Sequence, residues 1–386
     1  MKKFISTILS ASVILSLSTL SAFADSFLKG DINGDGKVSS ADALLVQRHT
    51  VGLTKLNDVQ QASADYNNDG KITNVDALLI LRSTINLNVP MLYLPSEITI
   101  NCGDRTTLNP KVINGSDKGL TYTYTFDGAV SDDGTGEPVL EVSYASGLVK
   151  GYHLGTDHVV VKASNGLTAE CNVTVVNNKT EKIIHVGEHT LKSTKEIMIY
   201  NDCYSETYDF DNILGLVVHS TAEPGIKADQ WYSMWNKGGT PACVHAFLDD
   251  EGVYQYLPFE QTAWHAGIPV NDTRIDFEIC EPAGFEYDKN WNITKYNTEE
   301  QQKYFDKIWE NATVYAAYLA YTYDFDTDQI ISHYEAGQMG IGTKHNDPDH
   351  WFIFHNKTMD DFRNDVEQLL NEEIYETEET IIGSLE

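Results

Sequence analysis

Two closely similar acidic segments near the N-terminus constrain the fold of this chain more than any other feature. One runs from Asp31 to Asp42 and the other from Asp65 to Asp76. Each carries oxygen-bearing side chains at its first, third and fifth positions, glycine at the sixth and aspartate at the twelfth, before an apolar helical pattern. Oxygen ligands at this spacing converge on one point, and the glycine allows the sharp turn of a calcium-binding loop. We therefore predict two structural calcium ions.

The ligands of these ions follow from their loop positions. The first ion is expected on Asp31, Asn33, Asp35, Lys37, Ser39 and Asp42, and the second on Asp65, Asn67, Asp69, Lys71, Thr73 and Asp76. The two lysines would contribute backbone carbonyl oxygens, and the residue at position nine often binds through water.

The duplicated unit of loop and helix resembles a type I dockerin over residues 26–89. Asp closes each loop in place of the Glu of the common EF-hand, and no helix is evident before either loop. The likeness implies a small all-α calcium-binding domain that binds a cohesin domain of a scaffolding protein, as in a cellulosome. Ser40-Ala41 and Asn74-Val75 stand where the family more often has Ser-Thr for cohesin recognition. A calcium-stabilised spacer without a partner is the alternative.

The first residues predict the compartment. Lys2 and Lys3 precede an apolar run that ends at Ala22-Phe23-Ala24, which is the pattern of a cleaved signal peptide over residues 1–24. We expect a secreted protein that is not attached to a membrane after cleavage. The 27 basic and 57 acidic side chains give a formal charge of −30, which argues against a nucleic-acid partner. Five cysteines are too few for a disulfide scaffold, and their pairing stays open.

Residues 91–177 show short alternating stretches broken by Gly, Asn and Asp, which predict an all-β sandwich. The closing stretch from Gly155 to Val175 resembles bacterial immunoglobulin-like domains. We interpret this domain as a spacer rather than a carbohydrate-binding module. His153 and His158 have no acidic or cysteine partners at ligand spacing, so we expect both on the surface.

The histidines gather in the C-terminal part, where seven of the twelve fall between His219 and His355. His219 ends one apolar strand pattern and His333 ends another, and Asp347 follows shortly afterwards. Two imidazoles and one carboxylate suit zinc with a fourth position open for water. Such distant residues can meet only through the fold.

Four motifs in order make the likeness specific. His-Ser-Thr after a strand, then Ala263–Gly267, Ile275–Glu281 and a Ser-His…His-Asn-Asp-Pro pattern resemble the type 2 N-acetylmuramoyl-L-alanine amidases, over residues 184–371. The likeness implies an α/β domain with a mixed central sheet flanked by helices. It also implies one catalytic zinc on His219, His333 and Asp347, a general base at Glu278, and His345 in the place of an oxyanion-stabilising Lys. His245, Trp264 and His265 are the substrate-binding residues that it implies.

The resemblance implies a zinc-dependent amidase that cleaves the bond between the lactyl group of N-acetylmuramic acid and L-alanine in peptidoglycan. A non-catalytic peptidoglycan-binding protein of a cellulosome-like complex is the alternative. A glycosidase finds no support, because no recognisable motif places an acid pair. Residues 372–386 are expected to form a frayed acidic tail.

Overall fold

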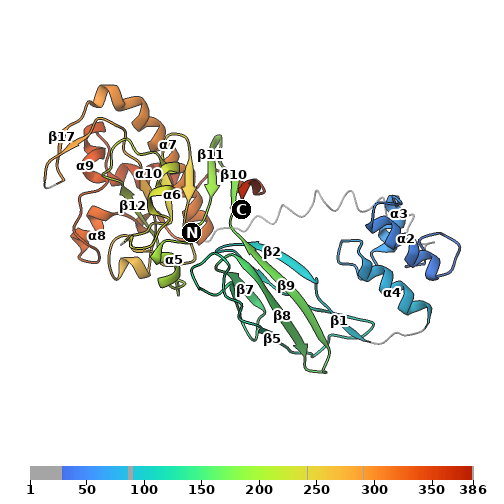
Figure 1. Ribbon diagram of the computed structural model, residues 1–386. Coiled ribbons are helices and arrows are strands. Elements are labelled where there is room, and N and C mark those ends of the chain that lie inside the picture. Colours follow the sequence, from blue (N-terminus) through green and yellow to red (C-terminus); the bar gives the residue numbers. More distant parts are fainter. Residues whose placement is uncertain (1–27, 86–89, 241, 290, 385–386) are drawn as a thin grey trace. The chain divides into compact units, whose positions relative to one another are not determined.

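The computed structural model describes residues 28–85, 90–240, 242–289 and 291–384, in two compact units (Figure 1). Among the described residues, the smaller unit comprises those up to Tyr93 with Pro110–Leu120 and Asn165–Thr168, and the larger unit comprises the others. The expected signal peptide, residues 1–24, lies outside the described residues. Within the described ranges, no helix has the length and apolar character needed to cross a membrane.

The smaller unit contains three short helices and a two-stranded sheet. Its elements are α2 (Ser40–Thr50), α3 (Asp58–Ala64), α4 (Asn74–Thr84), β1 (Met91–Tyr93) and β4 (Lys111–Ile113). Ser39 caps α2 and Thr73 caps α4, each in a capping box with the aspartate three residues later. α3 enters the second loop directly, so the expectation of no preceding helix is wrong there; its amide-rich sequence hides an Asn57–Gln60 capping box.

Two sheets form the first part of the larger unit. Their strands are β2 (Glu97–Asn101), β9 (Thr168–Val176), β8 (Gly155–Ala163) and β5 (Tyr122–Phe126) in one, and β3 (Arg105–Thr107), β7 (Leu148–Gly151) and β6 (Leu140–Val142) in the other. Every second residue of β8 from Asp157 onward is buried, as expected for a strand with one inward face. The sheets meet at Gly151, where an added Cβ would lie 3.1 Å from side-chain atoms of Ile100 and Val175.

One surface assignment in this region is wrong. His153 is buried, with 1% of its surface exposed, and its Nδ1 lies 3.0 Å from the Asp133 carboxylate. The partner stands 20 residues away in sequence, so short-range spacing did not reveal it. His158, by contrast, keeps a partly exposed side chain.

A mixed nine-stranded sheet is the centre of the remaining described residues, and it agrees with the predicted α/β architecture. The order is β18-β12-β15-β13-β14-β11-β10-β19, with β20 also pairing with β10. The strands are β10 (Asn178–Val186), β11 (His189–Lys195), β12 (Leu216–Ser220), β13 (Ala246–Leu248), β14 (Val253–Gln255), β15 (Ile275–Ile279), β18 (Ile330–Ser332), β19 (Ile374–Glu376) and β20 (Thr380–Ser384). β12 pairs in parallel with both β15 and β18, whereas the β10–β11 and β13–β14 pairs are antiparallel.

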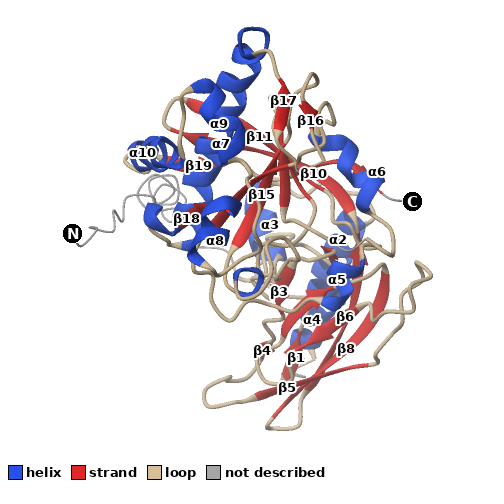
Figure 2. Ribbon diagram, turned by 90° about the vertical axis from the view of Figure 1, so that its left-hand side faces the viewer, coloured by secondary structure: helices blue, strands red, loops and turns tan. Residues whose placement is uncertain are grey.

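Helices surround this sheet (Figure 2). Their apolar side chains join the core of the sheet. The helices are α5 (Asp202–Glu206), α6 (Trp231–Trp235), α7 (Thr298–Tyr323), α8 (His333–Met339), α9 (Asp349–Phe352) and α10 (Met359–Leu369), and β16 (Glu286–Tyr287) and β17 (Ile293–Lys295) form a separate hairpin. Ile308, Ala312 and Ala316 of α7 join Phe362 and Val366 of α10 in one core with the strands. Thr358 caps α10 and Asn297 caps α7, each through a side-chain oxygen that accepts a backbone N–H.

The acidic C-terminal segment is not a frayed tail. β19 and β20 both pair with β10, at Ile184–Val186 and Asn178–Glu181 respectively. Two of the acids are bound by lysines: Glu376 lies 2.8 Å from Lys182 Nζ and Glu379 lies 3.5 Å from Lys195 Nζ. The edge of β10 offered unpaired backbone groups that the segment satisfies, and composition alone does not reveal such pairing.

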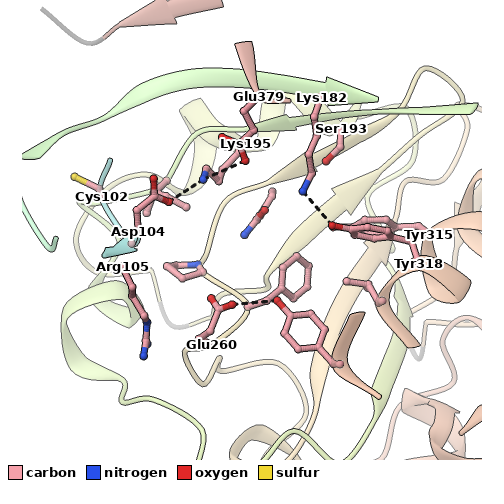
Figure 3. A pocket seen from close by; sticks show the side chains of 17 residues that line it. Cys102, Asp104, Arg105, Lys182, Ser193, Lys195, Glu260, Tyr315, Tyr318 and Glu379 are labelled. Carbon is pink, nitrogen blue, oxygen red and sulfur yellow. Dashed lines mark hydrogen bonds and ion pairs between the residues drawn. The ribbon is translucent and has the colours of Figure 1, made fainter. Parts of the chain in front are cut away.

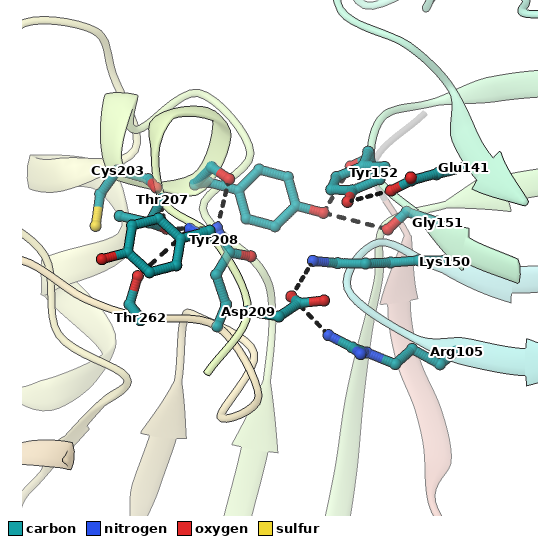
Figure 4. Close-up of polar contacts among 12 residues, drawn as sticks. Arg105, Glu141, Lys150, Gly151, Tyr152, Cys203, Thr207, Tyr208, Asp209 and Thr262 are labelled. Atoms are coloured by element: carbon teal, nitrogen blue, oxygen red, sulfur yellow. Dashed lines mark hydrogen bonds and ion pairs between the residues drawn. The ribbon is translucent and has the colours of Figure 1, made fainter. Parts of the chain in front are cut away.

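Charged contacts connect the two-sheet region to the large sheet within the larger unit. The Asp209 carboxylate lies 2.7 Å from Arg105 and 2.6 Å from Lys150, and the Tyr204 hydroxyl donates to the Tyr152 carbonyl (Figure 4). The Lys150 side chain is only 8% exposed. Removal of Asp209 would therefore leave a nearly buried ammonium group without its closest anion.

We expect Asp209→Ala to lower the free energy of unfolding of the larger unit by about 1–3 kcal/mol, the range for an unsatisfied buried polar group. Urea denaturation followed by tryptophan fluorescence measures this change. Asp211→Ala, at an exposed acid nearby, is the matched control. Equal stability of the two variants would contradict a stabilising role for Asp209.

Candidate metal centre

Three parallel strands bring the candidate site residues to one edge of the large sheet. In the β12–β15 pair, His219 lies directly opposite Glu278, and in the β12–β18 pair Val218 lies opposite Ser332. His333 is the next residue after Ser332 and begins α8. The carboxyl ends of parallel strands meet at the same edge, so these three side chains converge although they are far apart in sequence.

Asp347 completes a compact group with the two histidines. Its Oδ2 lies 3.3 Å from His219 Nδ1, and its Oδ1 lies 3.5 Å from His333 Nδ1. One ligand atom from each residue lies within 4.8 Å of the other two. All three side chains are buried. Asp349, the neighbouring acid, is not part of this group.

The donor atoms fit zinc in type and spacing. Zinc binds imidazole nitrogen and carboxylate oxygen at about 2.0–2.2 Å with tetrahedral geometry, so its ligand atoms are about 3.4 Å apart. The observed separations of 3.3 and 3.5 Å agree with this value. The outer nitrogens are already engaged: His219 Nε2 lies 3.0 Å from His265 Nδ1, and His333 Nε2 lies 2.7 Å from Thr343 Oγ1. Both histidines therefore turn Nδ1 toward Asp347.

The start of α8 is held firmly, which fixes His333. Ser332 caps the helix, accepting a hydrogen bond from the backbone N–H of Glu335. The Glu335 carboxylate binds the Arg363 guanidinium through two contacts of 2.8 and 2.9 Å. A bidentate pair of this kind restricts rotation as well as adding stability.

Burial and neighbouring charges shift the protonation of this site. Burial raises the pKa of Glu278 to about 8, against the lowering effect of His219, and the charge of Asp347 adds to the rise. One oxygen of Glu278, Oε2, is buried and has no hydrogen-bond partner among the described residues. Burial lowers the pKa of His219, but the hydrogen bond to Asp347 and the charge of Glu278 together raise it to about 9. Glu278 is therefore suited to exchanging a proton near neutral pH.

A cavity of about 440 Å³ opens over this group. His265, Glu278 and His345 line it together with the three candidate ligands. The His345 side chain is 59% exposed, its ring stacks on His333 at 4.2 Å between centroids, and its Nδ1 lies 3.5 Å from Asp347. An exposed imidazole in this position can reach a ligand in the cavity.

Two predicted substrate residues do not line the cavity. His245 has no exposed surface; its Nδ1 binds Asp276 and its Nε2 lies 2.7 Å from the Gln261 carbonyl, so the prediction of substrate contact is wrong. The histidine faces the interior because β13 is a fully buried central strand. Trp264 is half-buried and is absent from the cavity wall.

Sequence reasoning missed four residues on or beside the wall. Tyr287, Trp291 and His350 line the cavity, and Glu281 lies behind them, accepting from Ser220 Oγ at 2.8 Å and from the Tyr287 hydroxyl at 2.6 Å. Tyr287 and Trp291 belong to the β16–β17 hairpin region, which carries no motif. The Nε2 atom of His350 lies 3.1 Å from the Tyr287 hydroxyl. Of these four residues, only Glu281 could have been found from the sequence, because it lies three residues after Glu278.

Cysteine pairing contributes to one side of the cavity. Cys203 and Cys243 form a disulfide, and the backbone N–H of Trp264 lies 3.1 Å from Cys243 Sγ. Ala242, the residue before Cys243, lines the cavity. Cys102, Cys171 and Cys280 are buried free thiols. The disulfide therefore joins α5 to a segment at the cavity wall.

A second cavity of about 300 Å³ lies beside β10, β11 and α7, and each charged side chain that lines it has an ion-pair or hydrogen-bond partner (Figure 3). Lys195 binds Asp104 at 2.9 Å and lies 3.5 Å from Glu379. Lys182 donates to the Tyr318 hydroxyl at 3.0 Å, and the Tyr323 hydroxyl donates to Glu260. No histidine or cysteine cluster joins these acids among the described residues. We interpret this cavity as structural.

The two acidic loops of the smaller unit have matching hydrogen bonds. Asp31 accepts from the backbone N–H groups of Gly34 at 2.8 Å and Gly36 at 2.8 Å, and Asp65 accepts from Gly70 at 2.9 Å. Asp42 and Asp76 each accept from the start of their own loop, at 2.9 Å and 2.8 Å. These bonds bend each loop around its first and last carboxylates, as a calcium loop requires.

Comparison with known families gives matches for two parts of the chain. Residues 209–350 match the family model described as N-acetylmuramoyl-L-alanine amidase, and residues 29–83 match that of the dockerin type I domain. The chain contains an amidase-family domain and a type I dockerin domain. The amidase-family match contains His219, Glu278, His333 and Asp347. The dockerin match contains both acidic loops.

Curated relatives match shorter stretches of this chain. It is 34% identical over 95 residues to the N-acetylmuramoyl-L-alanine amidase CwlH of Bacillus subtilis, which covers 22% of this chain and 38% of that protein. It is 35% identical over 81 residues to the amidase XlyA of the same organism, covering 20% of this chain and 27% of that protein. The chain thus spans well under half the length of the curated relatives it matches.

Solved structures with some likeness include the Staphylococcus aureus hydrolase AmiA in complex with its ligand. The identity is 21%, the likeness covers 43% of this chain and 80% of that chain, and the TM-score is 0.35. The catalytic domain of XlyA has 21% identity, covers 42% of this chain and 90% of that chain, and has a TM-score of 0.31.

Protonation of His219 predicts a pH-dependent zinc affinity at the candidate metal centre. A metal ion binds only neutral imidazole, and because the pKa of His219 is raised to about 9, binding must displace a proton at every lower pH. The apparent zinc affinity should therefore rise about tenfold per pH unit between about pH 6 and pH 8. Competition with a chromophoric chelator measures it. A zinc affinity that stays constant over this pH range would contradict the raised pKa of His219.

The acidic loops of the smaller unit predict that calcium affinity depends on their carboxylates. We expect Asp42→Asn to weaken calcium binding about tenfold or more, because it removes one charge from the ligand set. Isothermal titration calorimetry on the full chain measures the affinity. Asp117→Asn, at an exposed acid of the same unit, is the control. Unchanged calcium affinity in Asp42→Asn would remove Asp42 from the ligands.

Proposed function

We propose that this protein is a secreted, zinc-dependent peptidoglycan amidase that is attached to a scaffold through its dockerin. The bond cleaved would join the lactyl group of N-acetylmuramic acid to L-alanine. The observation that carries the proposal is the convergence of two imidazole Nδ1 atoms and one carboxylate within 4.8 Å, at the floor of a cavity that also contains Glu278. The family matches and the names of the curated relatives support it.

The chain's own residues would divide the chemistry among them. A zinc ion, when bound by His219, His333 and Asp347, supplies the Lewis acidity that activates water and polarises the scissile carbonyl. Glu278 stands opposite His219 on the neighbouring strand, where it would take a proton from the attacking water. Its raised pKa would let it hold that proton and pass it to the leaving amine.

His345 would stabilise the negative charge that develops on the oxygen of the attacked carbonyl. Its exposed ring lies at the cavity beside Asp347, from which it could donate a hydrogen bond to the oxygen of the attacked carbonyl. A donor in such a role contributes about 3 kcal/mol in comparable sites. His265 would form part of the wall against the substrate, whereas Trp264 lies outside it.

The other domains would attach the enzyme to a scaffold and space it from the attachment point. The dockerin, loaded with two calcium ions, would bind a cohesin domain of a scaffolding protein and hold the enzyme outside the cell. The two-sheet region would be a bacterial immunoglobulin-like domain, supported by the alternating burial of β8 and β9. It would act as a spacer between the dockerin and the amidase domain.

A non-catalytic peptidoglycan-binding protein remains the second candidate, and one residue separates the two functions. Binding alone needs no proton acceptor beside the metal ligands, yet Glu278 lies at the cavity with one buried oxygen unpaired among the described residues. Mass spectrometry of muropeptides after incubation of cell walls with the full chain distinguishes the candidates. Zinc-dependent appearance of free L-alanine amino termini supports the amidase, and binding without cleavage supports the alternative.

Replacement of the proposed base separates chemistry from metal binding. Glu278→Gln should keep zinc but lower turnover by about 10²- to 10⁴-fold, the usual contribution of a general base. Asp347→Ala should lose both zinc and turnover. Release of amino termini and metal content by mass spectrometry measure the two effects. Glu286→Gln, an exposed acid outside the cavity wall, is the control, and full turnover in Glu278→Gln would exclude that base.

A further inference from the structure

A second layer of polar side chains lies behind the candidate ligands, and the proposed chemistry leaves it unused. His265 Nδ1 lies 3.0 Å from the outer nitrogen of His219. Asp276, on β15 two residues before Glu278, has no exposed surface, and ligand atoms of His219, His265 and Asp276 lie within 4.8 Å of one another. His245 binds the Oδ1 atom of this same aspartate. The four residues form a row that runs from the cavity into the core.

We propose that His265, supported by Asp276, is a positioning residue that fixes the ring of His219 for metal binding by accepting a hydrogen bond from its Nε2–H. The inference deepens the proposed function and depends on zinc binding to His219. It gives His265 a role at the metal centre in addition to its place in the cavity wall.

The assignment of protons follows from the contact between the two rings. A metal ion needs the lone pair of His219 Nδ1, which faces Asp347, so the proton of that neutral ring must be on Nε2. Since His219 Nε2 then donates across 3.0 Å, His265 Nδ1 must be the acceptor. The proton of neutral His265 is therefore on its own Nε2.

Two unpaired atoms lie where this assignment needs a donor and an acceptor. His265 Nε2 and Asp276 Oδ2 are both buried, and neither has a hydrogen-bond partner among the described residues. The Nε2–H of His265 is a donor and the carboxylate oxygen is an acceptor, and ligand atoms of the two residues lie within 4.8 Å of each other, so the two groups complement each other through one bridging water. Buried polar atoms are rarely left unpaired, which favours this connection.

The ends of the row are held in place. His245 Nε2 lies 2.7 Å from the Gln261 carbonyl, and that carbonyl can only accept, so the ring is fixed on both sides. The backbone N–H groups of His265 and Ala266 both donate to Asn271 Oδ1, at 3.2 and 2.8 Å. His265 is thus held through its backbone as well as through its ring.

An outer partner of this kind changes metal affinity without touching the metal. A second hydrogen bond orients the ligating ring and increases its basicity, and its loss typically costs 10- to 100-fold in affinity. Loss of a mere wall residue would affect substrate binding and leave zinc affinity unchanged. The two roles for His265 therefore differ in a measurement that needs no substrate.

The experiment compares His265→Ala with His265→Asn in the full chain. Asn can place a carbonyl oxygen near the position of Nδ1, so it keeps the acceptor that Ala removes. Zinc affinity is measured by competition with a chromophoric chelator, and the visible absorption of the cobalt(II)-loaded protein reports the geometry of the centre. Thermal unfolding in excess chelator separates loss of affinity from loss of fold. Asp276→Asn, nearly identical in shape, gives a second route if His265→Ala does not fold.

We expect His265→Ala to bind zinc about 10- to 100-fold more weakly with an altered cobalt spectrum, and His265→Asn to remain within several-fold of the wild type. Asp276→Asn should weaken binding in the same direction. Wild-type zinc affinity in His265→Ala, or in Asp276→Asn if the first variant is unfolded, would overturn the inference.

The same titration separates this failure from that of the proposed function. If the wild type binds zinc and Asp347→Ala does not, the proposed zinc site is supported irrespective of the result for His265. If Asp347→Ala binds zinc normally while Asp276→Asn loses it, the ion occupies the group of His219, His265 and Asp276, and both proposals are wrong.

Discussion

The parallel pairing of β12 with β15 and β18 is the constraint on which the candidate site depends. The pairing aligns His219 with Glu278 and brings His333 to the same edge, and a shift of one residue would turn these side chains to the opposite face. All five residues of β12 are buried, so its register is held by apolar packing on both faces. Packing of the hydrophobic core therefore determines which polar side chains lie close together.

Burial gives the same site its electrostatic character. Asp347 has a lowered pKa despite its burial because three histidines stand around it, whereas Glu278 has a raised pKa because burial outweighs the help of His219. Two carboxyl groups in one cavity thus prefer opposite protonation states. Such a difference suits a division between metal ligand and proton carrier.

The two kinds of candidate metal site gather their donor atoms in different ways. Each acidic loop of the dockerin gathers its donors within twelve consecutive residues, so its geometry depends on local turns and on the capping of one helix. The centre in the large sheet collects donors from three separate strands or loops. The first kind of site can form with little tertiary structure, and the second requires the complete sheet.

The errors of sequence reasoning follow the same division. His245 follows an apolar pattern and was assigned to the substrate, although only the buried position of β13 shows that it faces Asp276. His153 looked isolated because Asp133 lies on a distant turn, and the acidic C-terminal segment looked free because its partner β10 lies almost 200 residues earlier. Tyr287, Trp291 and His350 carried no motif at all. Each missed contact joins segments that are remote in sequence.

The amino-acid sequence by itself determined the two loop-and-helix repeats, the mixed α/β and all-β parts, and the candidate ligands His219, His333 and Asp347. Spacing within a few residues encodes turns, caps and strand periods, so turns, caps and strands can be predicted without knowledge of the fold. Only the tertiary structure decided which outer nitrogen meets His265, which histidine leaves the cavity and where the last strands pair. Those outcomes depend on distances between remote segments, which are set by the packing of the whole core.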